Sequence, residues 1–349
     1  MDTTNKFKLF LPAIKADNNN GISIISADIR QDVTYFAQYS TANKKVSVVK
    51  EATYNTSEFS SFSEMLLKFI SQFSCTNISK VAVAVPGPVI GGKSAPQRLS
   101  WTLDAEEIKA ATGIGKVYLI NDLEASAYGL GVNNGSSFLN IHETADFTPG
   151  NVALLSPGAG LGEAGLFWDG DCLRPFATEG GHCEFSPRTS DEVEFYHFLQ
   201  KIYGIVSWES VLSTAGLFNI YRFLRDAKQQ KQPDWLSQEI EAGNFTQAII
   251  NGALENRDRI CNMTIDTFII FLAREANSLV LKLKATGGLY LSGEIPVMLE
   301  RYLTNNKFYK NFIVSDRMET VLRDIPIYLV KDQNTIINGA AMFAAFSEE

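Results

Sequence analysis

The sequence has few cysteines, and they form no paired motif. Its 349 residues include four, Cys75, Cys172, Cys183 and Cys261, with no Cys-x-x-Cys spacing. Structural zinc sites take several closely spaced cysteine or histidine ligands, so a zinc cluster is not expected. Scattered thiols are typical of a reducing compartment, and we expect them to be free.

Long apolar runs and blocks of basic residues are also missing. No apolar run reaches the ~18 residues that a membrane helix needs. Residues 1–11 lack the charged-then-apolar pattern of a signal peptide. The chain has 31 Lys and Arg against 39 Asp and Glu, a formal net charge of −8. An acidic surface repels nucleic acid and anionic membrane, so we expect neither as a partner and expect a cytoplasmic protein.

What is present is a repeated order of strands and helices. A chain of 349 residues suits two domains better than one core. Short β-rich runs between turns predict strands, and apolar residues at helical period predict helices. The first 130 residues predict the order βββαβαβα, and the later chain repeats three strands followed by helices. The expected strands are 22–27, 33–39, 46–52, 81–85, 117–120, 152–155, 164–168, 172–176, 288–291 and 327–330, and the clearest helices are 59–73, 264–284 and 335–346.

A carboxylate follows the buried strand 117–120. Asn121 and Asp122 lie where this strand ends and a helix is expected to begin. In open α/β sheets, ligands bind at the carboxyl ends of strands, and a carboxylate there can accept a proton from a substrate hydroxyl. The alternative is an ordinary helix N-cap, for which Asn and Asp are preferred.

Two further segments combine carboxylates with turn or cap residues. Glu179 and His182 flank two glycines, which let the backbone approach a ligand closely, although a glycine turn with incidental polar neighbours is the alternative. Glu209 precedes an apolar helix, where helix capping is the alternative. His142 and His197 have no such neighbours, and we expect both to be structural or on the surface.

Three glycines at alternate positions, Gly158, Gly160 and Gly162, lie between two expected strands. The N–H groups of such a turn can face phosphate. The segment is neither a P-loop nor a dinucleotide-binding fingerprint, because no lysine follows it and no helix begins there. Taken alone, it is a weak indication of phosphate binding.

Several stretches match one known family in type, order and spacing: VAVAVPGPV, WTLDAEEI, VYLINDLEASAYGL, GAGLGEAGL, EGGHCEFSP, VSWESVLSTAGLFNIYRFL, GGLYLSG and NTIINGAAMFAAF. In this combination the chain resembles the bacterial glucokinases, within the hexokinase and actin-like ATPase superfamily. The resemblance implies an α/β, two-domain actin/hexokinase-like (ribonuclease H-like) fold with a cleft between the domains. The small domain would comprise 1–132 plus 334–349, and the large domain 133–333.

The resemblance also implies an activity and a sugar site. The activity is ATP-dependent phosphorylation of a hexose, expected to be glucose, to glucose 6-phosphate. Asp122 would be the general base that takes the proton from the sugar 6-hydroxyl. Four residues would hold the sugar hydroxyls, namely Asn121, Glu179, His182 and Glu209. Related enzymes are often homodimers, so a homodimer is an open expectation.

On the nucleotide side, the resemblance implies ATP with Mg²⁺. Asp28, at the end of the first strand, would position the magnesium ion. Gly158, Gly160 and Gly162 would form a phosphate loop, and Gly293 would lie beside the adenosine.

The nucleotide side departs from the family pattern. The family's Asp-x-Gly-Gly-Thr reads Asp28-Ile29-Arg30-Gln31-Asp32 here, which removes two glycines and a threonine. Ala159 replaces a threonine, Glu294 replaces a glycine, and Arg98 stands where the family has a sugar-contacting asparagine. Two hypotheses stay open: an active glucose kinase, and a catalytically impaired homologue that senses a hexose. Arg30 could compensate by contacting phosphate bidentately.

Overall fold

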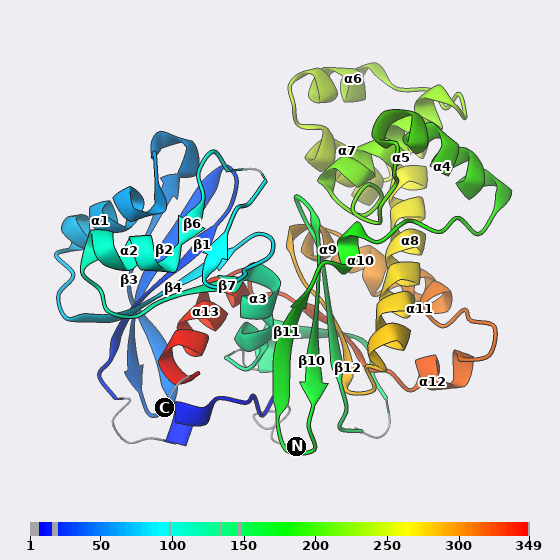
Figure 1. Cartoon of the computed structure of the whole chain (residues 1–349). Coiled ribbons are helices and arrows are strands. Elements are labelled where there is room, and N and C mark those ends of the chain that lie inside the picture. Colours follow the sequence, from blue (N-terminus) through cyan, green and yellow to red (C-terminus); the bar gives the residue numbers. More distant parts are fainter. Residues whose placement is uncertain (1–6, 16–19, 98, 133–134, 145–147, 348–349) are drawn as a thin grey trace. The chain divides into compact units, whose positions relative to one another are not determined.

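The computed structural model describes residues 7–15, 20–97, 99–132, 135–144 and 148–347. These residues divide into two compact units, each described here by itself (Figure 1). The first comprises Met1–Ser137, Ala164–Ala177 and Asp332–Glu349, and the second Phe138–Glu163 and Thr178–Lys331. Each unit has its own apolar core and helices packed on a sheet, which confirms the predicted α/β class.

The first unit is built on a five-stranded sheet with the order β3-β2-β1-β4-β7. β1, β2 and β3, the first three expected strands, form an antiparallel meander, and β4 and β7 continue the sheet in parallel with β1. A small two-stranded sheet pairs β5 with β6. The strands are β1 (Ser23–Ile29), β2 (Val33–Ala42), β3 (Lys45–Asn55), β4 (Ile78–Val85), β5 (Lys93–Ser94), β6 (Leu103–Asp104) and β7 (Val117–Asn121).

Four helices accompany this sheet: α1 (Phe62–Phe73), α2 (Ala105–Thr112), α3 (Asp122–Leu130) and α13 (Thr335–Phe346). α1 buries Phe62, Met65, Leu66 and Phe69, the positions that its helical period predicts. Asp104 caps α2 by accepting the Glu106 N–H. These helix starts could be predicted because the cap and the apolar stripe are local in sequence.

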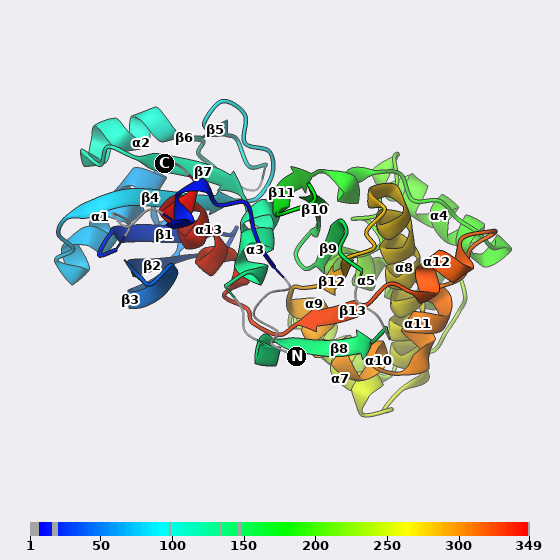
Figure 2. The same ribbon diagram turned by 90° about the horizontal axis from the view of Figure 1, so that it is seen from below.

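The last helix, α13, returns to the first unit, as expected. It packs against α3, β1 and β4. Helices α13 and α3 lie side by side in both views (Figures 1 and 2). Two glycines allow this close approach. A Cβ at Gly129 would lie 2.0 Å from the carbonyl oxygen of Thr335, and one at Gly339 would lie 1.8 Å from that of Ala125. The Ser26 hydroxyl also donates to the carbonyl of Ile337 at 2.8 Å.

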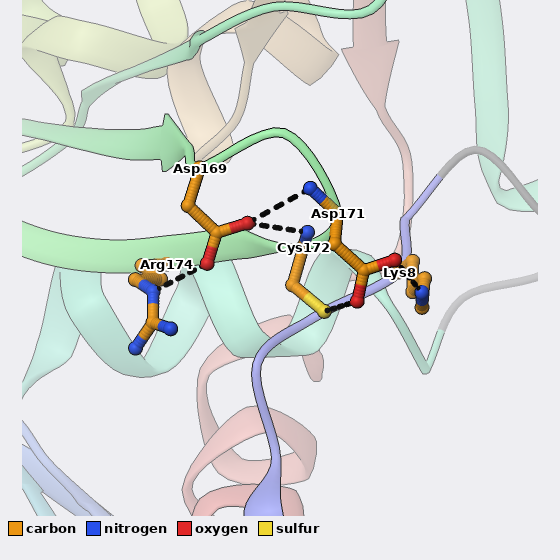
Figure 3. Close-up of polar contacts among 5 residues, drawn as sticks. All are labelled: Lys8, Asp169, Asp171, Cys172 and Arg174. Atoms are coloured by element: carbon orange, nitrogen blue, oxygen red, sulfur yellow. Dashed lines mark hydrogen bonds and ion pairs between the residues drawn. The ribbon is translucent and has the colours of Figure 1, made fainter.

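The described part of the N-terminal segment docks on the hairpin formed by the ends of β10 and β11. The main chain of Lys8 and Phe10 pairs with Leu173 at 2.8 and 2.9 Å. The Lys8 ammonium pairs with Asp171, and Arg174 lies 3.5 Å from the centre of the Phe10 ring. Figure 3 shows Asp169 in the turn of this hairpin, accepting from two main-chain N–H groups and from Arg174, which lowers its pKa to about 2.

The second unit is built on a six-stranded sheet with the order β11-β10-β9-β12-β13-β8. β9, β12 and β13 are parallel, and β8, which the sequence did not reveal, pairs antiparallel with β13. Residues Ala164–Ala177, which form the hairpin end of β10 and β11, belong to the first unit. The strands are β8 (Phe138–His142), β9 (Val152–Pro157), β10 (Leu161–Trp168), β11 (Leu173–Thr178), β12 (Gly288–Leu291) and β13 (Ile327–Val330).

The longest helix of this unit is α8 (Arg259–Leu283), capped by Asp258 and buried along most of its length. It packs against α5, α7, α11 and β9, and so forms the centre of the second core. The other helices are α4 (Ser190–Tyr203), α5 (Thr214–Asp226), α6 (Asp234–Glu241), α7 (Phe245–Leu254), α9 (Glu294–Met298), α10 (Glu300–Leu303), α11 (Asn306–Phe312) and α12 (Glu319–Arg323).

Candidate functional site

The predicted residues of the first unit lie at one edge of its sheet. In the parallel strands, Asp28 of β1 is level with Ala84 of β4, and the next residue of β4, Val85, is level with Asn121 of β7. Asp28, the penultimate residue of β1, and Asn121, the last residue of β7, therefore lie at the carboxyl ends of two strands that are separated only by β4. This edge is where parallel α/β sheets bind ligands.

Asn121 is the N-cap of α3. Its side-chain oxygen accepts the N–H groups of Leu123 and Glu124 at 2.9 and 3.1 Å, and its amide donates to the carbonyl of Gly87 at 3.0 Å. Asn121 is therefore a helix N-cap, as the alternative interpretation of the sequence expected, and its hydrogen bonds fix the start of α3. A sugar contact by Asn121 remains a prediction.

Asp122 is the first residue of α3 and is half-buried. One carboxylate oxygen accepts the N–H of Leu123 at 2.8 Å, and the helix N-terminus favours the charged form. Two residues further along α3, burial raises the pKa of Glu124. An ionised carboxylate with a fixed orientation is the form in which an aspartate can act as a general base.

Asp28 is 3% exposed and is paired with Arg30. Nε and Nη2 of Arg30 both donate to Oδ2 of Asp28, at 3.0 and 2.9 Å. The guanidinium also lies over the Tyr35 ring, 4.8 Å from its centre. The family pattern implies that a magnesium ion would lie at Asp28. Here the positive charge beside Asp28 is the guanidinium of Arg30.

The turn that carries Arg30 is closed by hydrogen bonds to its main chain. The Arg30 N–H donates to Val33 at 3.0 Å, its carbonyl accepts the Thr56 hydroxyl at 2.8 Å, and the Thr56 N–H donates to Asp32 at 3.0 Å. None of the residues 28–32 has a positive φ, so this turn does not need the glycines of the family pattern.

Magnesium does not fit Asp28 in this arrangement, because one carboxylate oxygen already receives two guanidinium hydrogen bonds. Within the described ranges, no group of three or more His, Cys, Asp or Glu side chains is placed to hold a metal ion. We therefore derive no step through magnesium at this position.

In the second unit, the glycine loop joins β9 to β10. The Gly158 N–H donates to the carbonyl of Gly160 at 2.8 Å, and the carbonyl of Gly158 accepts the N–H and hydroxyl of Thr214 at 2.8 and 3.1 Å. Gly293 follows β12 with φ of 92°, and a Cβ there would lie 2.8 Å from the carbonyl oxygen of Pro157. The structure thus brings together the loop and Gly293, both predicted for the nucleotide.

Glu209 links this loop to the Glu179–His182 turn. Its Oε2 accepts the N–H of Leu161 at 3.0 Å and lies 2.5 Å from where a Cβ at Gly160 would be. Its own N–H donates to the carbonyl of Gly181 at 2.9 Å. The three predicted segments of the second unit are therefore neighbours.

The Glu179–His182 segment is a tight turn that needs its glycines. A Cβ at Gly181 would lie 2.1 Å from the carbonyl oxygen of Leu161, so no other residue fits without moving the backbone. Glu179 and His182 are both exposed. Polar side chains presented by a packed, rigid turn are suited to binding sugar hydroxyls.

Two buried carboxyls beside this turn were missed in the sequence. Glu163 on β10 is 2% exposed and Glu275 on α8 is 0% exposed. Burial is the main cause that raises the pKa of both carboxyls. It raises the pKa of Glu275 to about 8, and the nearby Glu163 adds to this shift. A glutamate within the otherwise apolar run from Leu161 to Phe167 was the available signal.

The remaining predicted residues lie elsewhere. Nε2 of His142 is 3.0 Å from the Arg323 carbonyl oxygen, and its ring stacks on Tyr309, while His197 is exposed on α4, so both are structural or on the surface, as expected. Arg98 lies outside the described residues. In the described part of the chain, no helix is both long and apolar enough to cross a membrane.

Comparison with known proteins agrees with the fold and with the motifs. A family model described as glucokinase matches residues 25–347. The glucokinase of Nostoc punctiforme is 30% identical over 338 residues, which cover 92% of this chain and 98% of that protein.

Two solved glucokinase structures share the fold, one from an Antarctic psychrotroph and one from Balamuthia mandrillaris in complex with glucose. The first has a TM-score of 0.77 at 24% identity and covers 92% of this chain and 98% of its own. The second has a TM-score of 0.76 at 18% identity and covers 95% and 96%. These matches confirm the fold predicted from the resemblance, and the chain belongs to the glucokinase family.

Proposed function

We propose that this protein is an ATP-dependent glucokinase, which transfers the terminal phosphoryl group of ATP to the 6-hydroxyl of glucose. Membership of the glucokinase family supports the reaction. The single observation that carries the mechanism is the placement of Asp122. It is a half-buried carboxylate at the carboxyl end of β7, oriented by the N–H of Leu123.

In this proposal Asp122 accepts the proton of the 6-hydroxyl as the hydroxyl oxygen attacks phosphorus. General-base assistance of this kind contributes ~10² to 10⁴ in rate. The sugar is held by Asn121, Glu179, His182 and Glu209. The connection of Glu209 to Leu161 and to the Gly181 carbonyl supports a role in holding the sugar, since both bonds restrict where its carboxylate can lie.

For the nucleotide, we propose that Gly158, Gly160 and Gly162 contact phosphate and that Gly293 lies beside the adenosine. Magnesium carried by ATP would neutralise phosphate charge, and we assign it no protein ligand. Arg30 is the cation at the first turn, and a guanidinium can bind phosphate oxygens bidentately if it leaves Asp28. The cytoplasmic location, the homodimer and the domain boundaries at 132, 133, 333 and 334 remain predictions.

A coupled assay for glucose 6-phosphate tests the proposal. We expect turnover with glucose and ATP, and a loss of at least ~10²-fold in kcat in Asp122→Ala, with glucose binding retained. Asp234→Ala is a matched control, because Asp234 is also the first residue of a helix but is exposed on α6. No turnover in the unmodified protein, with glucose binding intact, would favour the impaired hexose sensor instead.

A further inference from the structure

The buried carboxyl of Glu163 lies directly against the Glu179–His182 turn. A Cβ at Gly180 would lie 2.0 Å from Oε2 of Glu163, so the side chain occupies the space that this glycine leaves. Thr178 adds a second connection. Its hydroxyl donates to the Glu163 carbonyl at 2.9 Å and accepts the Gly180 N–H at 3.2 Å. The position of Gly180 therefore depends on Glu163 from two sides.

The Glu163 side chain also interacts with Glu275 of α8. The two carboxyls are close enough to hydrogen-bond to each other. Within the described residues, Oε1 of Glu163 and Oε2 of Glu275 have no partner as long as both groups only accept. A proton on either carboxyl gives the pair a hydrogen-bond donor, whereas two adjacent buried carboxylates cannot both ionise without a large cost.

Among the residues that the structure describes, few other charges act on this pair. Nζ of Lys282 is 3.3 Å from Oε1 of Glu275, but its side chain is 53% exposed, so water screens much of its charge. Arg274, the neighbour of Glu275 on α8, is engaged with Glu192 and with the carbonyl of Ser186. One partly exposed lysine leaves the pair with an excess negative charge unless it keeps a proton.

We propose that Glu163 is a positioning residue for the glucose site, which shares one proton with Glu275 and thereby fixes the turn that presents Glu179 and His182. When this proton is lost, the two carboxylates repel, Glu163 shifts, and Gly180 moves with it. Glucose then binds less well, while the chemistry at Asp122 is not directly affected. This inference rests on the proposed function, because Glu179 and His182 are taken as sugar ligands.

The test is the pH dependence of glucose binding, measured by calorimetry without nucleotide. In the unmodified protein we expect the Kd for glucose to rise about tenfold between pH 6.5 and pH 9, equivalent to about 1.4 kcal/mol. In Glu163→Gln the dependence should be largely lost, because the amide keeps a donor toward Glu275 and does not ionise. Equal pH dependence in the two proteins would overturn the proposal.

A second readout separates this inference from the proposed function. The backbone amide resonance of Gly180, followed by NMR without sugar, should titrate with pH in the unmodified protein and stay constant in Glu163→Gln. Glu275→Gln should also abolish the titration, which covers the case in which the first variant does not fold. If glucose fails to bind, the proposed function is wrong, yet a titrating Gly180 still supports the proton pair, and a constant one rejects it.

Discussion

The buried carboxyl pair predicts an unusual dependence of stability on pH. Burial and the proximity of Glu163 raise the pKa of Glu275 from an ordinary 4.5 to about 8 in the folded protein. A carboxyl with a raised folded pKa contributes stability that is fully present below its unfolded pKa. That contribution is lost as the pH rises through the folded pKa. The chain should therefore lose stability between about pH 5 and about pH 8, a range in which ordinary carboxylates no longer titrate.

The size of this loss follows from the shift. The difference, about 8 minus 4.5, is about 3.5 pH units. Each unit corresponds to about 1.4 kcal/mol, so the titration of Glu275 should lower the free energy of unfolding by several kcal/mol as the pH rises from about 5 to about 8. This is a large share of the stability of an ordinary domain, and it should be visible in a simple denaturation experiment.

Urea unfolding followed by tryptophan fluorescence, at several pH values in that range, measures the effect. Glu275→Gln should remove most of the pH dependence, since the amide does not titrate. Glu241→Gln, at an exposed position on α6, should leave it unchanged. The comparison concerns how steeply the free energy of unfolding falls with pH in each protein. A constant difference in stability caused by the substitution itself does not matter. If the unmodified protein and Glu275→Gln lose stability in parallel as the pH rises, the assignment of a buried proton to this pair is wrong.

Two further predictions concern the loops. The combined change Arg30→Gly, Gln31→Gly and Asp32→Thr should free Asp28 and raise the affinity for ATP with magnesium in calorimetry. Unchanged or weaker nucleotide binding would show that the turn has been misinterpreted. Gly160→Ala should raise the glucose Kd severalfold, because the added Cβ would lie 2.5 Å from Oε2 of Glu209. Gly158→Ala, with no atom within 4 Å of its Cβ, should change the glucose Kd much less, and an equal effect of both changes would refute the role of Glu209.

Much of the fold could be predicted because its signals are local. The apolar runs at β4, β12 and β13 are buried strands, the run at β7 is a partly buried one, and their composition alone indicates them. β8 was missed, since Phe138–His142 has no strong alternation and pairs with a strand far along the chain. The docking of Leu9 beside Leu173 was missed for the same reason, because a single main-chain pairing leaves no pattern in the sequence.

In the candidate site, too, some residues could be predicted from local motifs and others could not. Asp122, Glu179, His182 and Glu209 could be named from short motifs. The structure makes the segments of the last three neighbours, and the roles of all four residues remain predictions. The consequence of Arg30 could not be foreseen. A cation two residues from Asp28 can bind phosphate or the aspartate, and only the turn geometry, which aims Nε and Nη2 at Oδ2, distinguishes these outcomes.

The partnership of Glu163 with Glu275 was equally hidden. The two residues come from a strand and a helix that are widely separated in the sequence, and nothing local to either predicts the other. Charged residues are rarely fully buried without a partner, so a glutamate in an apolar run is a signal that its partner must be sought elsewhere. Finding that partner required the packing of α8 against the sheet.

The most direct test of the central claim is a crystal structure of the protein with glucose bound. The account predicts that a carboxylate oxygen of Asp122 lies within about 2.6–3.2 Å of the sugar 6-hydroxyl. It also predicts that Glu179, His182 and Glu209 contact the other hydroxyls of the same molecule. Glucose bound at another place, or in an orientation that turns its 6-hydroxyl away from Asp122, would contradict it.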